Sequence, residues 1–195
     1  MRRVFTCLAV LFSVMVLAAC TTSVPETKPV PEMTFDYLGS FPVRVAAVDI
    51  EDRYDPERDA ADVSSSFPTP PDILLRRYAE TRLKAAGEEG TLRFIIEDTH
   101  IHHSLVQPAG NLTLWMGMNR KDLYEVDMKV RMYTVSEGGI EGPHSVLNLQ
   151  RSIAIPQSYS VDERDQEKFK FLELLMKDVD KAVTDTLANK MGLAG

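Results

Sequence analysis

Cysteine is almost absent from this sequence of 195 residues, which has only Cys7 and Cys20, both near its start. A disulfide, a cysteine-based metal site or a thiol nucleophile would need cysteine elsewhere in the chain. The lack of cysteine after Cys20 therefore excludes all three from the rest of the protein. We expect the fold to depend on packing alone.

The chain also lacks an excess of positive charge. It has 22 Lys and Arg residues against 29 Asp and Glu residues, a formal net charge of -7 at pH 7. Loss of Arg2 and Arg3 with an N-terminal segment would lower this charge by two, to -9. Nucleic acids and anionic lipid headgroups attract basic surfaces, so the balance argues against nucleic-acid binding and against electrostatic adhesion to a membrane.

Familiar catalytic motifs are missing as well. The sequence has no nucleophile elbow, no phosphate-binding glycine loop and no His-Glu zinc motif. Glu97 and Asp98 are adjacent in a predicted strand, where neighbouring side chains point to opposite faces, so they do not form an acid-base pair. We therefore predict that the protein is not an enzyme and needs no cofactor.

The start of the chain has the pattern of an export signal. Arg2 and Arg3 precede an unbroken run of apolar and small residues from Val4 to Ala19. A charged start, a short apolar stretch and small residues before the cleavage point are typical of secretory signals. The run is shorter than the roughly 20 residues that a membrane-spanning helix needs, so we predict that residues 1–19 are a cleaved signal peptide.

The sequence Leu17-Ala18-Ala19-Cys20 resembles the lipobox of bacterial lipoproteins. This resemblance implies acyl chains such as palmitate on Cys20, which would bind the protein to a membrane. Burial of acyl chains contributes about 0.8 kcal/mol per methylene, and two or more chains give durable attachment. Thr21 stands where an aspartate would direct such proteins inward, which favours the outer membrane over the inner membrane, with the protein facing the periplasm.

The mature chain divides into a tether and one domain. Residues 20–33 contain Pro25, Pro29 and Pro31 among small and charged residues, a composition that stays extended. At about 3.1 Å per residue, this tether would hold the domain up to about 40 Å from the bilayer. Residues 34–195 are enough for a single domain with its own core, and no internal repeat is visible.

Two elements are predicted at the start of the domain. The valine-rich apolar run at 43–50 is typical of a strand covered on both faces. After a polar loop at 53–68, residues 69–72 combine a threonine cap, proline and an acid, which predicts a helix start. Gly87 is placed where a helix ends in a left-handed conformation. The predicted inner face of this helix consists of Leu75, Ala79, Leu83 and Ala86.

A long antiparallel hairpin is predicted next. Segments 91–106 and 112–135 have an extended pattern, and residues 108–111 between them are turn formers. In the second arm apolar and charged residues alternate, which predicts one buried face and one solvent-exposed face. The apolar set of this arm is Tyr124, Val126, Met128, Val130 and Met132.

The last two elements complete the predicted fold. Residues 146–155 alternate like a strand, a capping box lies at 160–163, and apolar residues recur at helical spacing from there to Met191. The resulting order is strand, helix, three strands, helix. All apolar faces are buried in an α+β two-layer sandwich, with two helices on one face of a four-stranded, mostly antiparallel sheet.

A lipobox followed by this element order resembles the small envelope lipoproteins that assist lipopolysaccharide assembly or serve as auxiliary subunits of lipid-transporting ABC systems. Arg151, Ser160 to Arg164 and Leu175 to Asp178 are similar to the end of the lipopolysaccharide-assembly lipoproteins. The resemblance implies a protein partner in the envelope and leaves a lipid ligand open. Residues 21–23 depart from the glycine-aromatic start of that family, so only Cys20 is carried over as a site residue.

Three histidines, His100, His102 and His103, lie toward the end of the first hairpin arm. If the turn centres on residues 109–110, His103 faces Met116, and imidazole with thioether suits copper. Alternation sends His100 and His102 to one face and His103 to the other, so the three converge only with a bulge. A half-exposed polar strand end is therefore favoured over a metal site.

An apolar group near the hairpin tip is a candidate contact for a partner. Aromatic and methionine side chains at an exposed edge often mark such surfaces, although burial in the core is the more common fate of these residues. The group consists of Leu114, Trp115, Met116 and Met118.

The favoured hypothesis is a non-enzymatic lipoprotein, anchored through Cys20, that serves as an accessory or scaffold subunit of an envelope transport or assembly system. The alternative is a ligand-binding or copper-buffering envelope lipoprotein that uses the histidines and methionines near the hairpin tip.

Overall fold

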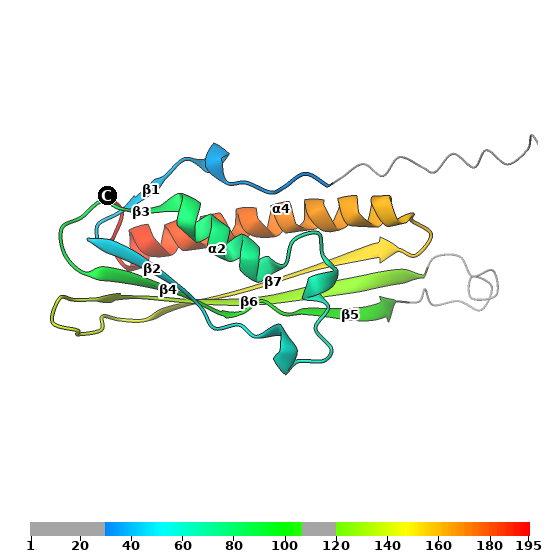
Figure 1. The fold of residues 1–195 in the computed structure, drawn as a ribbon, viewed down its shortest axis with the longest axis horizontal. Helices are drawn as coiled ribbons and strands as arrows, with labels where there is room; N and C mark the ends of the chain where they lie inside the picture. Colours follow the sequence, from blue (N-terminus) through cyan, green and yellow to red (C-terminus); the bar gives the residue numbers. More distant parts are fainter. Residues whose placement is uncertain (1–29, 107–119) are drawn as a thin grey trace, which may run out of the picture.

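The computed structural model describes residues 30–106 and 120–195, in which one main sheet carries the fold. Its strands are β2 (Ala47–Asp52), β4 (Thr91–Asp98), β5 (Ile101–Val106), β6 (Lys121–Val135) and β7 (Ser145–Pro156). The long strand β6 pairs antiparallel with β7 along one edge, and with β4 and β5, placed end to end, along the other. β2 extends the sheet beyond β4 in the parallel sense (Figure 1).

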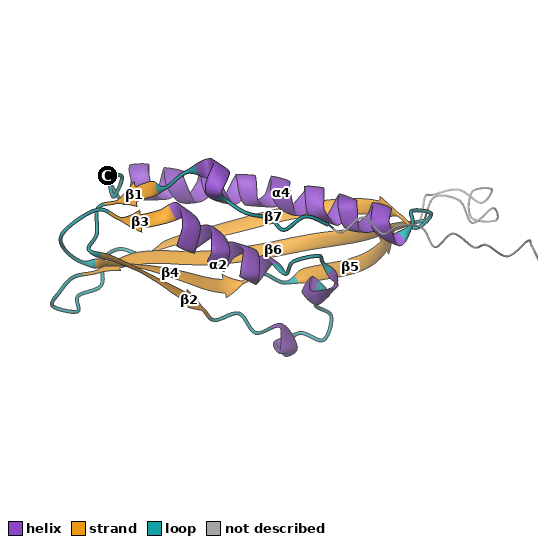
Figure 2. Cartoon of the chain, turned by 45° about the horizontal axis from the view of Figure 1, so that its top comes forward, coloured by secondary structure: helices purple, strands orange, loops and turns teal. Residues whose placement is uncertain are grey.

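Two helices, α2 (Pro71–Arg82) and α4 (Val161–Asp185), lie on the same side of this sheet (Figure 2). Their apolar side chains share one continuous core with the sheet. Asp180 of α4 joins the two helices, because its Oδ1 accepts hydrogen bonds from the Tyr78 hydroxyl and from Nε of Arg82, each at 2.9 Å. No helix in the described parts of the chain is long and apolar enough to cross a membrane.

The two clearest sequence patterns are confirmed. Along β6, Tyr124, Val126, Met128, Val130 and Met132 are buried, and the charged residues between them are more exposed. At the start of α4, the Ser160 amide donates to the Glu163 carboxylate at 2.7 Å, and the Ser160 hydroxyl accepts from the Glu163 amide at 3.3 Å. This is the predicted capping box.

The predicted strand at 43–50 is wrong in its bounds and in its environment. Residues up to Val43 belong to β1 (Phe41–Val43), which pairs in parallel with β3 (Leu83–Ala85) in a separate two-stranded sheet. The chain bends at residues 44–46 before β2 starts. β2 lies at an edge of the main sheet and is half-buried, so it is not covered on both faces.

The predicted ends of the first helix are also wrong. α2 begins at Pro71, and Pro70, at the cap position, offers no side-chain acceptor, so Thr69 is not the cap. The helix ends at Arg82 because the next three residues leave it to form β3. Gly87 therefore does not end a helix; its amide donates to the Val45 carbonyl at 3.0 Å.

The described parts of the two predicted hairpin arms pair antiparallel, but the first arm is divided and the register differs, while the predicted turn at 108–111 lies outside the described residues. A bulge follows Ile96, and the first arm continues as β5 from Ile101. His103 pairs with Tyr124, so the expected pairing of His103 with Met116 is wrong. The mixed α/β class and the mostly antiparallel sheet are as expected, whereas β1, β3 and the division into β4 and β5 depart from the predicted element order.

Candidate functional site

The face of the main sheet turned away from α2 and α4, here called the open face, is polar. In the described part of the chain both helices lie on the other side (Figure 2). Alternation along the strands places Glu125, Asp127, Lys129 and Arg131 of β6 on the open face, together with their partners on β4 and β7. Its side chains include Arg93, Glu97, Glu125, Asp127, Lys129, Arg131, Asn148, Gln150 and Ser152.

Ion pairs organise the half of the open face near β2. The Glu97 carboxylate accepts from Nζ of Lys129 at 3.0 Å and from Nη2 of Arg131 at 2.5 Å, and Arg93 pairs with Asp49 on β2. Surface pairs of this kind contribute only about 0–1 kcal/mol each. Their main effect is to fix the orientation of long side chains across neighbouring strands.

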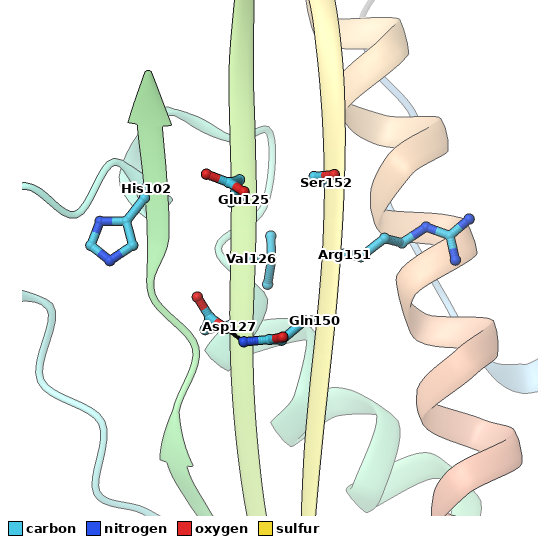
Figure 3. A pocket seen from close by; sticks show the side chains of 7 residues that line it. All are labelled: His102, Glu125, Val126, Asp127, Gln150, Arg151 and Ser152. Atoms are coloured by element: carbon cyan, nitrogen blue, oxygen red, sulfur yellow. Dashed lines mark hydrogen bonds between the residues drawn. The ribbon is translucent and has the colours of Figure 1, made fainter. Parts of the chain in front are cut away.

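A depression of about 550 Å³ lies on the other half of the open face, across β5, β6 and β7 (Figure 3). His102 comes from β5, Glu125 and Asp127 come from β6, and Gln150 and Ser152 come from β7. The Gln150 amide donates to the Asp127 carboxylate across the strand pair. The depression is open to solvent rather than enclosed, which suits a docking surface better than an enclosed ligand site.

Arg151 contributes backbone to this depression, while its side chain leaves the open face. Figure 3 shows the side chain directed toward α4, where it pairs with Asp178. Since the pair joins β7 to α4, it supports the strand that carries Gln150 and Ser152.

His100 stands beside the depression between two carboxylates. Its Nδ1 lies 2.8 Å from Asp98 Oδ1, and its Nε2 lies 3.4 Å from Asp127 Oδ2. Burial alone would lower the pKa of His100, but the hydrogen bond to Asp98 and the charges of Asp98, Asp127 and Asp62 outweigh it and raise the pKa. The geometry therefore favours a protonated imidazole that holds two carboxylates together.

Asp62 holds the loop at 53–68 against β5. Its Oδ1 accepts from the amides of Ile101 at 2.9 Å and Ser64 at 3.0 Å, and its Oδ2 accepts from the Tyr54 hydroxyl. Burial opposes ionisation of Asp62, but these hydrogen bonds prevail and lower its pKa. The charged carboxylate thus fixes the start of β5 and the placement of His100 and His102.

Replacement of His100 by glutamine should reduce stability more in acid than in base. Because the folded-state pKa is raised above the unfolded value of about 6.5, the contribution of His100 is fully present below that pH and is lost as pH rises through the folded pKa. We expect His100→Gln to lower the free energy of unfolding by about 1–2 kcal/mol at acidic pH, where the charge-assisted hydrogen bonds are complete. Urea unfolding across the pH range measures the difference.

His144→Gln is the matched control for this prediction, because His144 pairs with Glu141 in an exposed turn. A loss for His100→Gln that stays constant from acid to base would contradict the proposed imidazolium bridge.

The three histidines are divided between the two faces, as alternation predicts. The rings of His100 and His102 lie 4.5 Å apart between centroids on one face. His103 points to the other face, where its Nε2 lies 3.0 Å from Asp122 Oδ1 and its ring lies 5.1 Å from that of Tyr124. In the described ranges no group of three or more His, Cys, Asp or Glu side chains is arranged to hold a metal ion.

The carboxylate that His103 contacts belongs to a buried polar cluster on the helix side. Asp122 accepts from Nε2 of Gln157 at 3.0 Å and lies 3.7 Å from Nη1 of Arg164. Burial would raise the pKa of Asp122, but the hydrogen bonds and the charges of His103 and Arg164 lower it.

Nearby, Lys168 donates to the Ser66 carbonyl at 2.8 Å, and burial lowers the pKa of its ammonium group. The partners of these side chains account for their burial.

Two predicted sites fall outside the described residues. These are Cys20 with the leader, and the apolar group near the hairpin tip, which consists of Leu114, Trp115, Met116 and Met118. Their roles stay predictions from the sequence.

Comparisons with known proteins do not assign the chain to a family. No protein-family model matches it, and no curated protein sequence matches it. Among solved structures, it is similar to a minor lipoprotein from Acinetobacter baumannii, with a TM-score of 0.42 and 11% sequence identity over 78% of this chain and 97% of that one. It is also similar to a protein from Helicobacter pylori described as a homolog of neuraminyllactose-binding hemagglutinin, with a TM-score of 0.39 and 11% identity over 85% and 95% of the two chains. At these TM-scores neither likeness bears on function.

Sequence reasoning missed the depression on the open face. The sequence pattern places Glu125 and Asp127 only on the solvent-exposed side of one strand, and it does not identify Gln150 and Ser152 as candidate site residues. The sequence contained one signal for the depression, which is the second alternating strand at 145–156. If this strand pairs with β6, its polar residues lie beside those of β6 on the same face.

Proposed function

We propose that this protein is an envelope lipoprotein, anchored through Cys20, that acts as a non-enzymatic accessory subunit and binds a protein partner with its open face. The observation that carries the proposal is the polar face of the sheet, on which no helix of the described residues lies, with its depression across β5, β6 and β7. The lipobox sequence supports the anchor, and the proline-containing composition of residues 20–33 supports an extended link between the anchor and the domain.

The chemistry of the open face suits a protein surface with basic and polar groups. Asp127 accepts from Gln150 and lies 3.4 Å from Nε2 of His100, whereas no lysine or arginine side chain that lines the depression pairs with Glu125. Ser152 and His102 add hydrogen-bonding groups around them. Interfaces commonly combine such polar contacts with ordered side chains. The ion pairs on Glu97 and the bridge at His100 hold these groups in place before binding, which lowers the entropic cost of association.

The proposal is tested with a photo-crosslinking residue at position 152 in the native host. Ser152 is exposed at the depression, so an adduct with an envelope protein is expected there after mild-detergent purification and mass spectrometry. Lys177 is also exposed, on α4 and away from the open face, and provides the control position. Equal crosslinking at both positions, or an adduct at position 177 alone, would exclude the open face as the docking surface.

A further inference from the structure

One end of the sandwich carries a group of exposed apolar side chains. Among the described residues, four of the nine exposed large apolar side chains lie there: Leu105 and Val106 at the end of β5, Tyr159 in the turn after β7, and Val161 at the start of α4. Their exposed fractions are 57%, 41%, 38% and 73%. We call these four residues the apolar end.

The sheet register brings these residues to one place. Val106 on β5 pairs with Lys121 on β6, and Lys121 pairs with Pro156 on β7. The turn with Tyr159 and the first residue of α4 follow directly, so the four side chains border the same end of the molecule. Figure 1 shows the ends of β5 and β7 and the start of α4 together at the right.

Hydrogen bonds hold this end in a fixed shape. Arg164 donates to the carbonyls of Gln157 at 2.5 Å and Tyr159 at 3.1 Å, and the capping box orders the first turn of α4. Tyr159 and Val161 are therefore presented on an ordered turn rather than on a loose chain. Apolar side chains exposed on an ordered surface lose little entropy when they enter another apolar medium.

The described chain starts near the same end. Val30 and Pro31 lie with Gln166 and Phe169 around a small cavity of about 230 Å³, one to two helical turns from Val161. The ten residues that connect Cys20 to Val30 span at most about 35 Å when fully extended. The 15 residues of β6 span about 50 Å, so the opposite end of the sandwich lies farther from Val30 than the apolar end does.

We propose that the apolar end rests on the surface of the lipid bilayer that holds the anchor. This inference depends on the proposed lipid at Cys20, since the tether is what brings this end near the membrane. Tyr159 suits the headgroup region, where tyrosine places its ring in apolar surroundings and its hydroxyl in water. Arg120 and Lys121 at the same end supply cations for phosphate groups, beside the acids Asp162 and Glu163 of the first turn of α4. In this orientation the open face stands upright on the membrane and is accessible from the side.

Depth-dependent quenching tests the orientation. A thiol-reactive fluorophore is attached to Val161→Cys in the full lipidated protein, where Cys20 is blocked by its acyl chains, and the protein is inserted into phosphatidylcholine vesicles that contain nitroxide-labelled lipid. Ile140→Cys is the matched control, because Ile140 is 74% exposed in the turn at the opposite end. We expect quenching at position 161 to be at least three times that at position 140.

The outcomes separate the two proposals. Vesicle flotation is measured first. If the protein does not float with the vesicles, the proposed lipid anchor at Cys20 is wrong, and the proposed orientation loses its basis. A protein that floats but is quenched equally at positions 161 and 140 keeps its anchor and overturns the contact of the apolar end with the bilayer.

Discussion

A protein with Gly87→Ala is expected to lose about 3 kcal/mol of folding free energy, with the sandwich otherwise unchanged. A Cβ at this position would lie 2.6 Å from the carbonyl carbon of Arg44 and 2.6 Å from the amide nitrogen of Val45. Both are backbone atoms, so no flexible side chain can move aside. The chain between β1 and β2 must shift instead.

The conflict at Gly87 concerns more than one contact. The Gly87 amide donates to the Val45 carbonyl at 3.0 Å, and the Ala86 amide donates to the Val43 carbonyl at 2.8 Å. A shift that makes room for a methyl group lengthens both hydrogen bonds, and Val43 and Val45 are themselves buried in the core. Alanine in place of glycine restricts the unfolded chain and would gain about 0.4–1 kcal/mol at a site without conflict, which is too little to offset this loss.

Gly138→Ala is the matched control for Gly87→Ala. The nearest atom to a Cβ at Gly138 is Oγ of Ser136 at 3.9 Å, and its backbone does not adopt a positive φ angle. We expect its free energy of unfolding in urea to stay within about 0.5 kcal/mol of the unsubstituted protein. If Gly87→Ala is as stable as Gly138→Ala, the close approach of residues 44–45 to Gly87 is not a feature of the folded protein.

Local sequence patterns correctly predicted the elements that have one face in the core and one face in solvent along their whole length. β6 alternates because one face meets the helices and the other meets water, and α4 has a capping box followed by apolar residues at helical spacing. These signals are contained in short windows of sequence. The mixed α/β class followed from them, because a one-sided sheet and amphipathic helices bury their apolar faces only against one another.

The errors arose where distant segments decide the local structure. The valine-rich run at 43–50 is divided because its first residue pairs with β3, which is some forty residues away in the chain. The same pairing ends α2 at Arg82, although the helical pattern continues past it. Neither residues 43–50 nor residues 83–85 contain a signal for the other, so propensity within each window could not reveal the pairing.

The candidate site was predictable only where local alternation decides the direction of a side chain. Alternation alone placed His100 and His102 opposite His103, and the structure confirms it. The partners of His103 depended on the register of the hairpin, which a presumed turn at 109–110 set incorrectly. Prediction of the depression would have required both the register of the strands and the knowledge that β6 and β7 are neighbours in the sheet. Strand order depends on the whole chain and is not contained in a local motif.

Cys20→Ala is expected to abolish lipid attachment, the largest functional effect of any single change proposed for this chain. The lipobox resemblance implies that all acyl chains are on Cys20, and the sequence has no cysteine after it. With two or more chains removed at about 0.8 kcal/mol per methylene, the ratio of membrane-bound to free protein should fall by more than about a thousandfold. Incorporation of labelled palmitate, followed by partition of the protein between detergent and aqueous phases, measures both effects.

Cys7→Ala separates the lipidated thiol from cysteine in general. Cys7 lies inside the apolar run at 4–19, where alanine preserves the predicted export pattern, so palmitate incorporation should stay at the level of the unsubstituted protein. Label that persists in Cys20→Ala would place the acyl chains elsewhere and remove the argument for a tether that starts at Cys20. Loss of label in both variants would mean that processing of the leader had failed, and the mass of the N-terminal peptide identifies that outcome directly.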